Sequence, residues 1–301
     1  MEIVEVGPRD GLQNEKKLLS TATKVDYIRQ AIAAGLRRIE AVAFAHPARV
    51  PQMADAEAVL AAVPRIEGVS YSGLLLNRRG LDRALASAAD GFGVDEVNYV
   101  LVATDVFSSR NQGMTSAESL AQWSVIAADA RAAGLRTTIT IAAAFGCPFT
   151  GEVPVERVRD LVAAAAQAGP DEICLADTIG VGVPRQVAAL AAAAREVAPD
   201  VTLRAHFHNT RNTGYANAIA AGDHGITVLD ASTGGIGGCP FAPAATGNIA
   251  TEDLAYLLKR NGQLTGVDVS ALATTGRWIT AELEVPTPAL LGRAGPFPPE
   301  F

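Results

Sequence analysis

The chain has 301 residues, of which 49% are hydrophobic and 19% charged, so it can bury a large core, either as two ordinary domains or as one α/β barrel. Its formal net charge of −7 and its sequence pI near 5.2 argue against a nucleic-acid surface. No apolar run reaches the length that spans a bilayer, which argues against a membrane role.

The cysteines and the start of the chain indicate the compartment. Three cysteines in a chain of this length do not form a disulfide framework. The sequence opens directly on the strand-like segment Glu2-Ile3-Val4-Glu5-Val6 instead of a signal or transit peptide. We therefore expect a protein of the reducing cytoplasm.

Short apolar runs alternate with longer helix-like segments, and no shift in composition marks a linker. The expected strands are Ile3-Val6, Arg38-Ala43, Val69-Leu76, Glu96-Val102, Thr137-Ala142, Glu172-Ala176, Leu203-His208 and Thr227-Asp230. The expected helices are Ala22 to Ala34, Ala54 to Ala62, Ala117 to Ala133, Val155 to Ala168, Pro184 to Ala198 and Thr213 to Ala221. Left-handed helix caps are expected at Gly35, Gly134, Gly169 and Gly222.

Eight such units in one chain predict an α/β fold, a single-domain (β/α)8 TIM barrel over residues 1–301. An open doubly wound sheet would carry a Gly-rich phosphate loop after its first strand. Here the stretch Val6-Gly7-Pro8-Arg9-Asp10-Gly11 lacks that spacing. The tail from about residue 270 is expected to be an apolar or helical extension that packs on the barrel or on another subunit.

Polar residues follow the ends of several expected strands, where the functional residues of such barrels lie. Arg9 and Asp10 follow the first strand, Asp177 and Thr178 follow the sixth, His206 and His208 close the seventh, and Asn248 sits in a loop after the eighth, while Glu40 lies within the second. Taken singly, Asp10, Asp177 and Asn248 have an ordinary interpretation as turn or cap residues. Taken together, they predict one site at the mouth of the barrel.

The pair His206 and His208 carries the strongest chemical signal within this set. Two residues apart on a strand, both imidazoles project from the same face and can offer two nitrogens to one metal ion. The alternative is a core histidine beside a surface histidine. A local group of cations, for which Lys16, Lys17 and Arg49 are candidates, would suit an anionic substrate.

Five stretches of the chain form a distinctive set. They are Glu5-Val6-Gly7-Pro8-Arg9-Asp10-Gly11-Leu12-Gln13-Asn14-Glu15, Val50-Pro51-Gln52-Met53, Asp177-Thr178-Ile179-Gly180-Val181-Gly182, His206-Phe207-His208 and Gly235-Ile236-Gly237-Gly238-Cys239-Pro240-Phe241. This set resembles the 3-hydroxy-3-methylglutaryl-CoA (HMG-CoA) lyase family of metal-dependent TIM-barrel lyases. The resemblance runs from about Ile3 to Leu258.

The resemblance implies a site and its ligands. Asp10, His206, His208 and Asn248 are expected to bind a divalent metal, which is Mg²⁺ or Mn²⁺ in the family, although the donor types would also suit Zn²⁺. Glu40 and Asp177 are expected to orient the substrate, and Gln13, Lys16 and Thr178 to contact it. The resemblance implies an acyl-CoA substrate, no organic cofactor, no nucleic-acid or membrane partner, a homodimer, and a role in leucine degradation.

The implied reaction is cleavage of a 3-hydroxy-3-substituted acyl-CoA to acetyl-CoA and a keto acid. Arg9 would stabilise the enolate that forms on the thioester carbonyl. Cys239 would protonate that enolate from a glycine-rich loop. His206 and Asp10 are both candidates for the base that removes the hydroxyl proton.

Departures from the family pattern bear on the substrate. Thr138 and Thr140 stand where the family usually has Arg and Tyr, which is expected to change the pocket wall. Citramalyl-CoA is therefore an alternative thioester. A Claisen-type synthase, an aldolase of free keto acids and a non-catalytic barrel are the competing interpretations. Cys174 is expected in the core, and Cys147 near the mouth in a structural motif.

Overall fold

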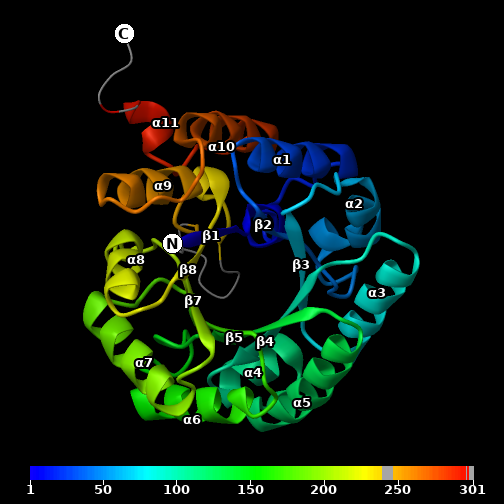
Figure 1. The fold of residues 1–301 in the computed structure, drawn as a ribbon, viewed down its shortest axis with the longest axis vertical. Helices are drawn as coiled ribbons and strands as arrows, with labels where there is room; N and C mark the ends of the chain where they lie inside the picture. The colour runs from blue at the N-terminus through cyan, green and yellow to red at the C-terminus, as the bar shows by residue number, and fades with distance from the viewer. Residues whose placement is uncertain (239–246, 296, 298–301) are drawn as a thin grey trace.

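The protein forms a closed barrel of eight parallel strands, each hydrogen-bonded to the next and β8 to β1 (Figure 1). The structure is a computed structural model that describes residues 1–238, 247–295 and 297. The strands are β1 Glu2–Glu5, β2 Arg38–Ala43, β3 Ser70–Leu75, β4 Glu96–Val102, β5 Arg136–Ala142, β6 Glu172–Asp177, β7 Thr202–Phe207 and β8 Val228–Ala231. The predicted TIM barrel is confirmed.

Helices surround the barrel as an outer ring (Figure 1). The α-helices are α1 Thr21–Ala33, α2 Ala56–Ala62, α3 Arg78–Ala89, α4 Asp105–Gln112, α5 Ser116–Ala132, α6 Val155–Ala166, α7 Pro184–Val197, α8 Gly214–Asp223, α9 Thr251–Arg260, α10 Val269–Leu283 and α11 Leu291–Ala294. Three shorter helical turns are η1 Gly7–Gly11, η2 Pro51–Met53 and η3 Thr233–Gly235.

The sequence predictions named no segment for helices α3, α4 and α9, whereas α10 and α11 lie within the tail that was expected to be apolar or helical. The start of α3, Arg78-Arg79-Gly80, has the composition of a turn, yet Asn77 caps the helix by accepting a hydrogen bond from Gly80 N at 3.2 Å. Helix α4 is short and mostly polar, so its hydrophobic periodicity is weak.

Three of the four expected glycine caps have the left-handed backbone that glycine favours, at Gly35, Gly134 and Gly169. The expected cap at Gly222 is wrong. Helix α8 continues to Asp223, and the left-handed residue is Gly225, with φ of 78°.

Charged side chains fill the barrel interior below the site. Arg38 is ion-paired with Glu96 at 2.8 Å and with Glu172 at 2.7 Å. Thr138 donates to Glu96 at 2.8 Å and is fully buried, so it belongs to this lower layer. The expectation that Thr138 forms part of the pocket wall is therefore wrong, because its hydroxyl points into the ionic layer beneath the cavity.

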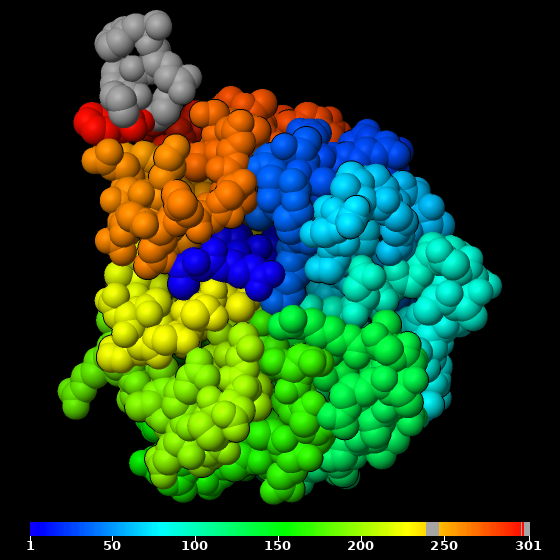
Figure 2. Space-filling view, in the orientation of Figure 1, coloured from blue at the N-terminus to red at the C-terminus, as the bar shows by residue number. Residues whose placement is uncertain are grey.

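The C-terminal helices close the ring beside the start of the chain. Helix α10 packs against α1, α9 and η3, in line with the expected extension onto the barrel. Figure 2 shows the first residues, in dark blue, near the centre of one face, where Glu2 is exposed. Since the strands are parallel, their carboxyl ends lie at the other end of the barrel. No helix in the described part of the chain is long and apolar enough to cross a membrane.

Candidate active site

The turn η1, directly after β1, directs Arg9 and Asp10 into the barrel mouth. The amides of Asp10 and Gly11 both donate to Val6 O, at 2.7 and 3.2 Å. This tight turn needs glycine at position 7, where a Cβ atom would lie 2.0 Å from the Tyr27 hydroxyl oxygen. The turn and its close packing against Tyr27 of α1 thus set the direction of both side chains.

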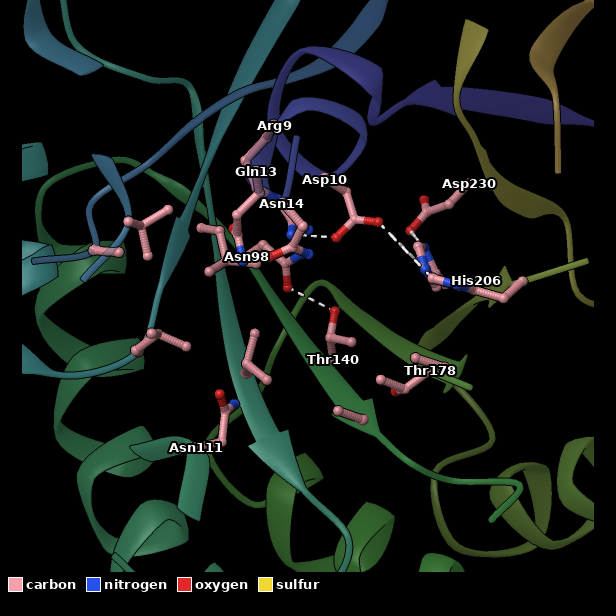
Figure 3. Close-up of a pocket in the computed structure, with 18 of the residues that line it drawn as sticks. Arg9, Asp10, Gln13, Asn14, Asn98, Asn111, Thr140, Thr178, His206 and Asp230 are labelled. Carbon is pink, nitrogen blue, oxygen red and sulfur yellow. Dashed lines mark hydrogen bonds and ion pairs between the residues drawn. The ribbon is translucent and has the colours of Figure 1, made fainter. Parts of the chain in front are cut away.

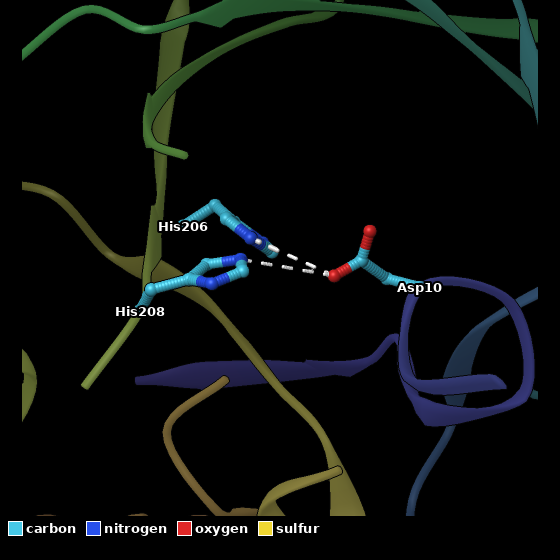
Figure 4. Close-up of side chains that lie close together, drawn as sticks. All are labelled: Asp10, His206 and His208. Carbon is cyan, nitrogen blue, oxygen red and sulfur yellow. Dashed lines mark ion pairs between the residues drawn. The ribbon is translucent and has the colours of Figure 1, made fainter. Parts of the chain in front are cut away.

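The carboxylate of Asp10 faces His206 of β7 and His208, which directly follows β7, across a small gap (Figure 4). His206 Nε2 lies 3.9 Å and His208 Nε2 lies 4.0 Å from Asp10 Oδ2. Ligand atoms of all three residues lie within 4.8 Å of one another. Both gaps exceed a hydrogen bond, so the arrangement suits an ion held between the three side chains.

Asn248 lies beside this triad because its backbone forms a bridge with His208. Its Nδ2 donates to Asp10 Oδ2 at 2.9 Å and to Ile236 O at 3.1 Å. Its Oδ1 is buried with no hydrogen-bond partner among the described residues. A buried, unpartnered amide oxygen next to the triad fits a fourth ligand of a divalent ion.

The Arg9 guanidinium is held between two carboxylates. Its Nη1 lies 2.6 Å from Asp10 Oδ1, and its Nε and Nη2 contact Glu40 Oε1. Glu40 Oε2 accepts from Asn98 Nδ2 at 2.8 Å, and Asn98 Oδ1 accepts from Thr140 at 2.8 Å (Figure 3). A continuous set of contacts thus leads from the cavity wall at Thr140 to the metal-facing Asp10.

Asp230 is a site residue that sequence reasoning missed. It pairs in register with His206, and its Oδ2 lies 3.0 Å from His206 Nδ1 (Figure 3). Its other oxygen, Oδ1, contacts Arg204 Nε. The available signal was its place at the carboxyl end of the expected eighth strand, where catalytic residues of such barrels lie.

Burial and neighbouring charges together lower the pKa values of Asp10 and His208 and raise that of His206. Burial alone would raise the pKa of Asp10, but the charges of Arg9, His206 and His208 hold it well below its usual value. Burial would lower the pKa of His206, but Asp230 and Asp10 outweigh it and raise the pKa. Burial, then repulsion from His206, lowers the pKa of His208 to about 4.

A cavity of about 160 Å³ opens beside the triad. Its lining combines the polar groups already described with Gln13, Asn14, Asn111 and Thr178, and with apolar Leu74, Val100 and Phe107. Arg9 is the only Lys or Arg among the described residues that line it. Residues 239–246, which the structure does not describe, contain neither Lys nor Arg in the sequence.

Three expected substrate-binding residues lie outside the cavity lining. Glu40 is fully buried behind Arg9, and Lys16 is exposed. Asp177 is buried, and its oxygens accept hydrogen bonds from Val181 N and Gly182 N, each at 2.9 Å. This is the capping role that the sequence had left open for Asp177, and burial raises its pKa.

The three cysteines have different positions. Cys239 lies outside the described residues, so its proposed acid role stays a prediction. Cys174 is fully buried within the barrel, and burial raises the pKa of its thiol well above the usual value. Cys147 is buried beyond β5, with its sulfur 3.1 Å from the Thr104 hydroxyl oxygen.

Comparisons with known proteins agree along almost the whole chain. The family model described as HMGL-like matches residues 1–279. The chain is 48% identical to the (R)-citramalyl-CoA lyase of Chloroflexus aurantiacus over 99% of this chain and 96% of that one. It is 41% identical to the hydroxymethylglutaryl-CoA lyase of Pseudomonas mevalonii, over 94% and 92% of the two chains.

Solved structures give the same result. An HMG-CoA lyase from Acinetobacter baumannii, in complex with coenzyme A and 3-methylmalate, superposes with a TM-score of 0.92 at 37% identity. The match covers 99% of this chain and 95% of that one. The HMG-CoA lyase of Bacillus subtilis superposes with a TM-score of 0.91 at 38% identity, covering 96% and 95% of the two chains.

Proposed function

The chain belongs to the HMGL-like family, and on that premise we propose that it is a divalent-metal-dependent carbon-carbon lyase of acyl-CoA thioesters. It cleaves a 3-hydroxy-3-substituted acyl-CoA to acetyl-CoA and a keto acid. The observation that carries this proposal is the meeting of Asp10, His206 and His208 beside Arg9 in one cavity. The family and the class of reaction expected from the sequence are confirmed.

The thioester that we favour is citramalyl-CoA, with HMG-CoA as the second candidate. The citramalyl-CoA lyase relative is 48% identical, against 41% for the hydroxymethylglutaryl-CoA lyase of Pseudomonas mevalonii. Cleavage of citramalyl-CoA gives acetyl-CoA and pyruvate. Cleavage of HMG-CoA gives acetyl-CoA and acetoacetate, and would support the leucine-degradation role expected from the resemblance.

The charges in the cavity favour citramalyl-CoA, whose acyl group is one methylene shorter than that of HMG-CoA. Arg9 is the only Lys or Arg among the described lining residues, and Glu40 and Asp10 already hold its guanidinium. A free carboxylate on the substrate therefore lacks a second cationic side chain among the described lining residues. In citramalyl-CoA the carboxylate and the hydroxyl share one carbon, so both reach the triad together. In HMG-CoA an extra methylene separates them.

Each side chain has a role that its contacts allow. Asp10, His206, His208 and Asn248 would hold the ion, which when bound lowers the pKa of the substrate hydroxyl and orients it. Arg9 stabilises the enolate that forms on the thioester oxygen as the carbon-carbon bond breaks. Glu40 keeps the guanidinium in place from behind. Thr178, Gln13 and Asn98 line the acyl pocket and can donate hydrogen bonds to the substrate.

The base and the acid remain proposals. Asp230 takes the Nδ1 side of His206, so if Nε2 binds the ion, His206 has no lone pair for a proton. Asp10 keeps further lone pairs on its two oxygens, although its low pKa makes it a weak base. Cys239 is the proposed acid that protonates the enolate, and its thiol can deliver a proton near neutral pH.

The remaining expectations concern the metal, the assembly and the compartment. We propose Mg²⁺ or Mn²⁺ as the working ion. We also propose a homodimer, on the strength of the family resemblance, and a location in the reducing cytoplasm, because three cysteines do not form a disulfide framework. Lys16 is exposed at the surface and is kept as a proposed contact for the anionic CoA moiety.

The deciding experiment measures acetyl-CoA release by metal-stripped protein, with Mn²⁺ or Mg²⁺ restored, from citramalyl-CoA and HMG-CoA in parallel. The proposal expects cleavage only with metal, a higher kcat/KM for citramalyl-CoA, and a loss of activity in Cys239→Ala. A higher kcat/KM for HMG-CoA would reject the favoured thioester but keep the reaction class. Cleavage of neither would reject the reaction, and a free keto-acid aldolase would then be tested.

A further inference from the structure

Asp230 and Arg204 form a buried unit directly behind His206. Asp230 Oδ2 lies 3.0 Å from His206 Nδ1, and Asp230 Oδ1 contacts Arg204 Nε. Arg204 is fully buried and Asp230 is only 5% exposed. All three side chains point into the barrel, since Arg204 and His206 lie two residues apart on the same face of β7, and Asp230 of β8 pairs in register with His206.

Arg204 fixes the charge of Asp230. A buried carboxylate is costly unless it is paired, and Arg204 provides that pairing from inside the barrel. The positive charge of Arg204 is balanced in turn by two carboxylates of the lower ionic layer, because its Nη1 lies 3.5 Å from Glu172 and 3.7 Å from Glu96. Asp230 is therefore held as an anion, and an anionic carboxylate only accepts hydrogen bonds.

This arrangement selects one tautomer of His206. Because Asp230 accepts, His206 Nδ1 must carry a hydrogen, which leaves the Nε2 lone pair facing Asp10 and the centre of the triad. His208 lacks such support, since its Nδ1 is buried with no partner among the described residues. Of the two histidines, only His206 is oriented by a carboxylate.

We propose that Asp230 and Arg204 are positioning residues of the metal centre, which hold the His206 ring so that its Nε2 faces the ion. The proposal rests on the metal centre of the proposed function and is independent of which thioester is cleaved. It makes Arg204, which does not line the cavity, part of the support for the metal site.

The test measures Mn²⁺ affinity of the metal-stripped protein by isothermal titration, without substrate. Loss of a partner that orients a metal ligand typically weakens metal binding by about 10- to 100-fold. We expect Asp230→Leu to raise the Kd by that factor. Asp230→Asn keeps an oxygen acceptor without the charge, so we expect an intermediate Kd.

A double variant separates affinity from folding. Arg204→Met leaves Asp230 buried and unpaired, so we expect a lower melting temperature and a higher Kd for Mn²⁺. Adding Asp230→Asn removes the unpaired charge. We expect this second change to recover the melting temperature while the Kd stays at the level of Asp230→Asn alone.

Asp55→Asn is the control, because Asp55 pairs with the buried Lys24 at 2.6 Å and accepts a hydrogen bond from Thr21, away from Arg204 and His206. It should lower the melting temperature and leave the Kd near that of the wild type. A folded Asp230→Leu variant that binds Mn²⁺ like the wild type overturns the proposal. Wild-type protein that binds Mn²⁺ but cleaves neither thioester would reject the proposed function alone.

Discussion

Thr140 donates a hydrogen bond of 2.8 Å to Asn98 Oδ1 at the edge of the cavity. Asn98 also contacts Glu40, because its Nδ2 donates to Glu40 Oε2 at 2.8 Å. Glu40 is in turn ion-paired with Arg9. A residue that faces the acyl group is thereby linked to the guanidinium that we expect to stabilise the enolate. Substitutions in the cavity wall should therefore affect catalysis as well as substrate fit.

Thr140→Val removes the donor and leaves the buried Asn98 oxygen without a partner. A lost buried hydrogen bond costs about 1–2 kcal/mol, so we expect kcat to fall by about 5- to 30-fold through displacement of Arg9. Thr140→Ser keeps the hydroxyl and should retain most of the activity. The measurement is steady-state kinetics with the preferred thioester, and an unchanged kcat in Thr140→Val would show that the link does not matter.

Arg9→Lys keeps a positive charge but loses the planar fork that contacts Glu40 and Asp10 together. Removing one preorganised donor to a developing oxyanion costs about 10²- to 10³-fold, and we expect a fall of that size in kcat. Arg29→Lys, at an exposed position on α1, is the control and should leave kcat unchanged. A rise in KM at unchanged kcat would contradict the proposed role.

Metal binding should stabilise the fold. At free Mn²⁺ about 100-fold above its Kd, the free energy of unfolding should rise by about 2.7 kcal/mol, which is the linkage expected for a ligand that binds only the folded state. His208→Ala should remove this gain, whereas His224→Ala, an exposed histidine beyond α8, should keep it. Melting curves with Mn²⁺ and with chelator provide the measurement.

Glu252 should make stability depend on pH. Burial raises the pKa of this carboxyl from 4.5 to about 8, and its oxygens accept from Gly234 N at 3.0 and 3.2 Å. Between these two values the folded state holds more protons than the unfolded state, so stability is lost as the pH rises from about 4.5 through 8. Glu252→Gln should flatten this slope, as measured by urea unfolding at several pH values.

Comparing the wild type with Glu252→Gln isolates the contribution of Glu252 to the pH dependence of stability. Glu5, whose pKa burial also raises, contributes a loss of the same sign to both. His208 contributes the opposite sign, because its pKa of about 4 lies below its ordinary 6.5 and its contribution is lost as the pH falls between those values. Parallel slopes for wild type and Glu252→Gln would contradict the prediction.

Arg38→Met should damage stability more than chemistry. It leaves Glu96 and Glu172 buried and without their bidentate partner, which typically costs about 3–5 kcal/mol. Since Arg38 lies below the cavity, we expect the Kd for Mn²⁺ and the kcat of the folded fraction to stay close to the wild type. A large loss of Mn²⁺ affinity at unchanged stability would show that the lower layer acts on the site directly.

The sequence determined the fold because its local signals agree. Eight buried apolar runs alternate with helical segments, and parallel strands joined by helical crossovers close into a barrel. It also determined most of the candidate site, because barrel geometry brings strand ends such as Asp10 and His206 to one mouth. Helix α3 was missed because its start, Arg78-Arg79-Gly80, has the composition of a turn, and α4 because it is short and mostly polar.

Only the tertiary structure decided which polar groups meet inside the barrel. Asp230 and His206 are 24 residues apart, and Thr140 and Asn98 are 42 apart, so their pairing depends on strand register. Register also placed Thr138 in the lower ionic layer and Thr140 in the cavity. A sequence gives the direction of a side chain within its own strand, but the height of that strand against its neighbours is set by packing of the whole barrel.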